Sequence, residues 1–151
     1  MSQLPQEQTL YEYKVSITGM TEYGTNLAGL LSGTVAMPAS GARFDVYFEG
    51  PVTGEKVVGT IKGIDYLRFR ADGRMELDIH AEITTEDGRK ISVKADGVCL
   101  PRPESSISDL KENVTLFSTF EEFSWVNPLQ VWATGTVDLA KGQIHIKGYE
   151  A

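Results

Sequence analysis

Segments of alternating apolar and polar residues, joined by Asp-Gly turns, are the feature that most restricts how this chain can fold. Asp72-Gly73 and Asp87-Gly88 each lie between two such segments. Side chains on a strand alternate between its two faces, and Asp-Gly tolerates the positive φ angles found in tight hairpin turns. Residues 66–98 are therefore predicted to form a meander of antiparallel strands.

The same alternation continues on both sides of this meander. Further strands are expected at residues 10–18, 34–37, 43–50, 56–62, 114–120, 129–139 and 143–149. Residues 19–33 are expected to be irregular, because several glycines interrupt a possible short helix. Residues 100–113, which contain prolines and serines, are expected to form a loop long enough to act as a lid.

Together these segments predict an all-β protein, a closed antiparallel β-barrel of about eight to ten strands with little helix. A barrel is preferred to a sandwich because closure leaves no exposed strand edges. The length of 151 residues suits one domain, which we place at residues 10–151 after a flexible N-terminal arm, residues 1–9. An eight-stranded barrel is about wide enough inside for side chains or one small ligand.

Charge and composition argue against several classes of partner. The net charge of −7 argues against nucleic acid, whose phosphates bind clustered Lys and Arg. No apolar run approaches the roughly 18 residues of a membrane span, and the N-terminus lacks the pattern of a secretory signal. The single cysteine, Cys99, fits a reducing compartment, so we expect a cytoplasmic protein without membrane contact.

Asp78 and His80 share the polar face of the expected strand at residues 75–83. Histidine titrates near neutral pH and a neighbouring carboxylate fixes its tautomer, which suits acid/base catalysis. If this face lines the barrel, the pair could move a proton; if the face is solvated, the pair is an ordinary surface feature. Glu49 and Asp65 are further catalytic candidates, although carboxylates at strand ends often cap turns.

Large aromatic side chains on polar faces favour a ligand pocket. Tyr47 and Trp132 each share a strand face with polar residues, and ligand pockets combine aromatic walls with a few polar groups. Alternatively, these aromatics cover a protein interface. Trp125 and Asn127 are placed where they could close the mouth of a barrel.

No metal ion or cofactor is expected. The two histidines, His80 and His145, do not have the spacing of a zinc site. The sequence has neither a phosphate-binding glycine loop nor a dinucleotide fingerprint. Cys99 has no base beside it in the sequence, so we expect a buried, unreactive thiol.

Several short segments occur in an order that resembles a known family. They are Phe48-Glu-Gly-Pro51 followed by Gly54, Gly63-Ile-Asp-Tyr66, Leu77-Asp-Ile-His-Ala81 with Thr85-Glu-Asp-Gly88, and Phe123-Ser-Trp-Val-Asn127. The family comprises small bacterial and fungal β-barrels of unknown function, akin to the allene-oxide-cyclase barrel and more loosely to lipocalins.

The resemblance implies that a common cavity receives side chains from Glu49, Asp65, Asp78 and the segment 125–127. Two positions depart from the family pattern. Tyr66 stands where a tryptophan is expected, and His80 stands where an arginine is commoner. We count Tyr66, with Tyr47, Trp125, Asn127 and Trp132, among the expected ligand-binding residues.

These observations favour a cofactor-independent enzyme that acts on a small hydrophobic or aromatic carbonyl compound by proton transfer, as an isomerase, cyclase or lyase. The alternative is a non-catalytic carrier or sensor of a hydrophobic small molecule. A third possibility is a structural protein whose aromatic faces are subunit contacts. A homo-oligomer is expected, because several strands carry apolar residues on both faces.

Overall fold

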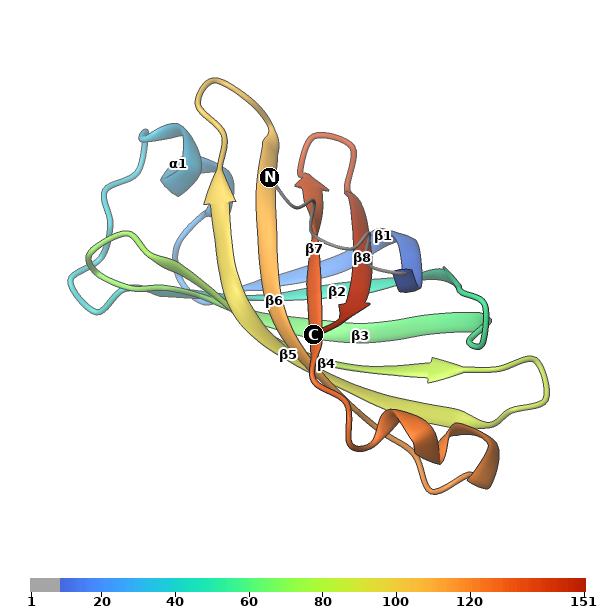
Figure 1. Ribbon diagram of the computed structural model, residues 1–151. Helices are drawn as coiled ribbons and strands as arrows, with labels where there is room; N and C mark the ends of the chain where they lie inside the picture. The colour runs from blue at the N-terminus through green and yellow to red at the C-terminus, as the bar shows by residue number, and fades with distance from the viewer. Residues whose placement is uncertain (1–8) are drawn as a thin grey trace, which may run out of the picture.

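The computed structural model describes residues 9–151 and shows a closed barrel of eight antiparallel strands (Figure 1). The strands are β1 (Thr9–Glu22), β2 (Ala42–Thr53), β3 (Gly59–Phe69), β4 (Met75–Thr84), β5 (Lys90–Pro101), β6 (Ile107–Phe117), β7 (Val131–Asp138) and β8 (Gln143–Glu150). Each strand pairs with the next, and β8 pairs with β1. The predicted all-β barrel is confirmed. The expected flexible arm lies outside the described residues, except for Thr9, which begins β1.

Two short helices lie at opposite ends of the barrel. α1 (Leu27–Ser32) follows β1, and the 3-10 helix η1 (Glu121–Val126) lies between β6 and β7 (Figure 1). The α1 end also contains the connections at residues 70–74, 102–106 and 139–142, and the η1 end contains those at 54–58 and 85–89. Neither helix in residues 9–151 is long and apolar enough to cross a membrane.

Some element boundaries differ from those expected. The strands expected at residues 56–62 and 66–70 belong to one strand, β3. Within the stretch expected to be irregular, β1 continues through a bulge and α1 then begins, with Asn26 Oδ1 accepting the Gly29 N–H. Residues 34–37, expected to be a strand, are irregular.

The lid expected at residues 100–113 is mostly strand. β5 continues to Pro101 and β6 begins at Ile107, so that only residues 102–106 connect them. Pro101 pairs with Ser108 at the end of this ladder, where a strand tolerates the missing proline N–H. The prolines therefore mark a hairpin connection instead of a long loop.

The interior of the barrel is filled differently in its two halves. Toward the η1 end, branched aliphatic side chains pack against one another: Val52, Ile61, Ile83, Ile91, Val114, Val126 and Val131 are each under 2% exposed. Toward the α1 end, the inward side chains surround a cavity. The barrel thus combines a packed half with a hollow half.

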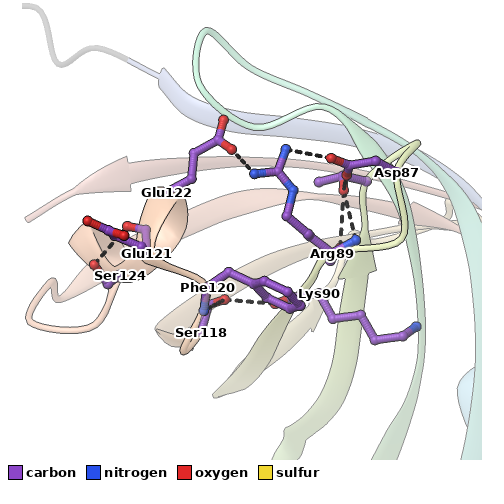
Figure 2. Close-up of polar contacts among 9 residues, drawn as sticks. Asp87, Arg89, Lys90, Ser118, Phe120, Glu121, Glu122 and Ser124 are labelled. Atoms are coloured by element: carbon purple, nitrogen blue, oxygen red, sulfur yellow. Dashed lines mark hydrogen bonds and ion pairs between the residues drawn. The ribbon is translucent and has the colours of Figure 1, made fainter.

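Polar contacts attach η1 to the β4–β5 connection and close the packed half (Figure 2). The Arg89 guanidinium forms ion pairs with Asp87, at 2.8 Å, and with Glu122 of η1. It also lies 5.0 Å from the centroid of the Phe123 ring, within the range of a cation–π contact. Phe123 itself is buried, so these contacts hold an apolar side chain of η1 against the packed end of the barrel.

Candidate active site

The cavity in the hollow half is mostly apolar. Its volume is about 50 Å³, more than the roughly 10–15 Å³ that one water molecule needs. Its walls include Val46, Phe48, Leu67, Leu77, Ile79 and Leu110, and Leu27 of α1 contributes to its lining. Leu27 is itself buried, so α1 covers the cavity from the end of the barrel.

The apolar face of β4 points inward, which corrects the expected position of Asp78 and His80. Leu77 and Ile79 line the cavity, whereas the side chains of Asp78 and His80 are 57% and 52% exposed. The two polar residues do meet, with His80 Nε2 at 3.1 Å from Asp78 Oδ1. They meet on the outer surface, so the solvated face is the alternative that the structure shows, and the pair does not line the cavity.

Other expected site residues also lie outside the cavity. Glu49 is exposed on β2. Tyr47 and His80 line an open groove on the outer surface of the barrel. Tyr66 is partly buried, and the Arg43 guanidinium lies 5.1 Å from its ring centroid. The cavity expected from the family resemblance therefore does not contain Glu49.

The remaining candidates have structural surroundings. The Trp132 side chain is exposed on β7. Trp125 is partly buried in η1, with Lys56 Nζ at 5.0 Å from its ring centroid. Asn127 accepts the Ser118 N–H at 2.8 Å and donates to the Ser118 carbonyl at 2.9 Å. Asn127 thus holds the β6–β7 connection at the packed end, far along the barrel from the cavity.

Two carboxyl groups line the cavity, Asp65 on β3 and Glu112 on β6. Asp65 is the one expected catalytic residue that the structure places there. Glu112 was not expected, because it lies in the stretch interpreted as a loop. The sequence does contain a sign of it. Glu112 occupies an inward position of the alternating pattern, between Leu110 and Val114, which are both buried.

Asp65 is held from the wall of the barrel. Its Oδ1 accepts the backbone N–H of Asp78 at 3.0 Å. Burial is the largest influence on this group and raises the pKa of Asp65 to about 7, against the opposite effect of that hydrogen bond. Near neutral pH, Asp65 therefore exists in both protonation states.

Glu112 is more deeply buried, with 3% of its surface exposed. Among residues 9–151, no group forms a hydrogen bond with its Oε2 atom. Burial, with a smaller contribution from repulsion by Asp65, raises the pKa of Glu112 to about 8. The neutral acid is therefore the main form of Glu112 at neutral pH, and it can donate a proton.

Tyr13 lines the cavity beside these acids, and its ring is stacked on those of Tyr11 and Phe48 at centroid distances of 6.1 and 6.4 Å. Burial, followed by the charge of Glu112, raises the pKa of both tyrosines, so the phenols stay neutral. Burial also raises the pKa of the Cys99 thiol to about 11. The thiolate that a nucleophile needs is therefore disfavoured.

This arrangement is suited to acid/base chemistry. Two carboxyl groups whose pKa values lie near neutrality can act as a general base and a general acid in one apolar cavity. Within the described part of the chain, no three His, Cys, Asp or Glu side chains form a group that could hold a metal ion.

Comparison with known proteins identifies the same fold elsewhere. The model of the family "Protein of unknown function (DUF3237)" matches residues 16–150. A protein of unknown function from Clostridium acetobutylicum superposes with a TM-score of 0.75 at 16% identity, over 96% of this chain and 98% of that one. A search of curated proteins gives no match.

Two further solved structures share the barrel. A β-barrel-like protein from Acinetobacter baumannii has a TM-score of 0.74 at 17% identity, over 99% of this chain and 98% of that one. An enzyme from Penicillium herquei has a TM-score of 0.59 at 18% identity, over 99% and 100% of the two chains. The resemblance to a small β-barrel family of unknown function is confirmed.

Proposed function

We propose, from the premise that the chain belongs to the DUF3237 family, that its barrel is a cofactor-independent enzyme moving a proton within a small apolar carbonyl compound. The supporting observation is that Asp65 and Glu112 line one apolar cavity. Isomerisation, cyclisation and elimination next to a carbonyl group can all begin with such a proton transfer. The Penicillium herquei barrel is an enzyme, which supports catalysis in a barrel of this kind.

Asp65 acts as the general base in this proposal. Its ionised carboxylate removes a proton from the carbon next to the carbonyl group, and the C–H electrons form the enol double bond. The Asp78 N–H, 3.0 Å from Oδ1, stabilises the carboxylate and fixes its position. In a conjugated enol, returning this proton to a different carbon while the enol O–H gives its proton back to Glu112 restores the carbonyl group and gives the isomer.

Glu112 acts as the general acid. In its neutral form it donates a proton to the carbonyl oxygen as negative charge develops there. The unpartnered Oε2 atom leaves the carboxyl group available for this contact. Low polarity in the surrounding walls strengthens the interaction, because fewer solvent dipoles compete for the charge.

A carrier or sensor of a hydrophobic small molecule is the second candidate. The observation in its favour is that the cavity is mostly apolar and covered by Leu27 of α1. In that case Asp65 and Glu112 would orient a bound molecule without changing it.

The test follows proton exchange at the carbon next to a carbonyl group. Acetone and butanone are incubated with the protein in D₂O, and the loss of the α-proton signal is measured by NMR. Wild-type protein is expected to accelerate exchange, and Asp65→Asn and Glu112→Gln should each lower the rate about a hundredfold or more. Glu76→Gln, on the outer face of β4, controls for the loss of one carboxylate.

The pH dependence adds a second readout. Exchange requires ionised Asp65, with a pKa of about 7, and protonated Glu112, with a pKa of about 8. The rate should therefore rise with pH through the first value and fall through the second, as a property of the coupled pair. Binding without exchange supports the carrier, and a loss of exchange only in His80→Ala points to the outer groove instead.

A further inference from the structure

The cavity contains acidic groups without a basic counterpart. Asp65 and Glu112 line it, and its lining, drawn from residues 9–151, includes no Lys, Arg or His. The two carboxyl groups are close enough that the charge of Asp65 raises the pKa of Glu112. A buried carboxylate without a positive partner is unfavourable, so this cavity favours a ligand that brings a positive charge.

We propose that the cavity binds a small protonated amine, with its ammonium group between Asp65 and Glu112. An ammonium group has three N–H donors and no acceptor. One donor would reach the Glu112 Oε2 atom, which has no partner in the described chain, and another would reach the Asp65 carboxylate. The inference uses the cavity of the proposed function but does not depend on any turnover there.

The rest of the wall suits the apolar part of the same ligand. Tyr13 and Phe48 line the cavity, with ring centroids 6.4 Å apart and an angle of 3° between ring planes. The apolar part of the amine would contact Leu77 and Leu110, which line the same cavity.

The size of the cavity restricts the ligand. A cavity of about 150 Å³ binds benzene, whereas this one has about 50 Å³, so it suits an ammonium group on a short alkyl chain. Amines that carry an aromatic ring, and polyamines, would need α1 to move away from the cavity mouth.

Proton release is the expected signature of amine binding. An ammonium group stabilises the ionised forms of Asp65 and Glu112, so each acid that is protonated before binding loses its proton. The other titratable groups facing these acids are Tyr11 and Tyr13 on β1, Asp45 on β2, Asp78 on β4 and Cys99 on β5. The raised pKa values of the two phenols and the thiol keep them neutral at about pH 8.

The experiment compares three small ligands of matched size: ethylamine, ethanol and acetate. Binding to the full chain is measured by titration calorimetry at about pH 8, where ethylamine is largely a cation. Ethylamine should bind at least about tenfold more tightly than ethanol, a difference of roughly 1.4 kcal/mol, and acetate should bind least. Buffers with different ionisation enthalpies then show whether protons are released.

Variants identify the groups responsible. Asp65→Asn and Glu112→Gln should each reduce the affinity ratio of ethylamine to ethanol, and the matched variant Glu76→Gln should retain it. Equal affinity for the amine and the alcohol in the wild type would overturn the proposal, as would an unchanged ratio in both cavity variants. If a variant fails to fold, the wild-type ratio and the proton count still decide.

The two proposals fail separately. Amine preference without exchange of ketone protons would contradict the enzyme and leave the amine site standing. Exchange of ketone protons without a preference for the amine would contradict the amine site and leave the enzyme proposal standing.

Discussion

Glu112 is a carboxylic acid on the mostly apolar inward face of β6, and this position changes its pKa. Its Oε2 atom has no partner among residues 9–151, and its neighbours along the inward face of β6 are Leu110 and Val114. Burial raises the pKa of Glu112 to about 8 and that of Asp65 to about 7. The folded protein therefore binds these protons more tightly than the unfolded chain does.

This difference predicts that the free energy of unfolding decreases between about pH 5 and about pH 8.5. For an acid with a raised pKa, stability is fully present below the unfolded pKa and is lost as pH rises toward the folded pKa. Groups with lowered pKa values, such as Asp109, lose their contribution only in more acidic solution. Urea unfolding across this range should show a decrease on the order of a few kcal/mol.

Glu112→Gln should remove much of this pH dependence, because the amide does not titrate. Glu76→Gln, on the outer face, should leave it unchanged. A wild-type free energy that stays constant over the range would show that both acids retain ordinary pKa values.

At the scale of elements, α1 covers the cavity through Leu27. Cys99 lines the same cavity, is 5% exposed and is the only cysteine in the chain. Its reaction with a small neutral thiol reagent therefore measures access to the interior. Leu27→Ala removes part of the cover and should accelerate labelling of Cys99 at least tenfold, a rough value for a site that opens by local fluctuation.

The control is Leu31→Ala, the same change on the same helix at a residue that is absent from the cavity lining. It should label at nearly the wild-type rate. Equal acceleration in both variants would mean that α1 unfolds as a whole, and no acceleration would place the route to the cavity elsewhere.

The β6–β7 connection depends on Asn127 and its two hydrogen bonds to the Ser118 backbone. Asn127→Ala should lower the free energy of unfolding by about 1–3 kcal/mol, because it leaves buried backbone groups without partners. Hydrogen exchange should increase locally in residues 118–127. Asn113→Ala, which removes an exposed amide contact with Asp96, should have a much smaller effect in both measurements.

The strands were predictable from alternation, because each strand of the barrel has one buried face. The location of the candidate catalytic residues was not predictable in the same way. The sequence drew attention to Asp78 and His80 in the polar phase of β4, yet that phase faces water. Glu112 carries the stronger signal, but Pro101 and Pro103 made its strand look like a loop. The meeting of β3 and β6 residues in one cavity depends on the closed barrel, which no local pattern contains.

At the scale of the whole molecule, closure leaves the outer surface as the place for contacts with other chains. Phe117, Phe120 and Trp132 are exposed on it by 57%, 43% and 51%. We propose that such side chains support a homo-oligomer, as large exposed apolar groups often do. Sedimentation velocity at micromolar concentration should show a species larger than the monomer, and Trp132→Thr should weaken it. A monomer under these conditions would contradict the expectation.

The packed and hollow halves of the barrel have a consequence for how its sequence can diverge. Side chains around the cavity can be exchanged for others without opening voids in the packed half, where loss of a large aliphatic group costs about 2–5 kcal/mol. Changes in ligand preference can thereby leave the packing of the η1 half intact. Libraries restricted to cavity positions such as Val46, Leu67 and Val137 should consequently yield a high proportion of folded variants with new selectivity.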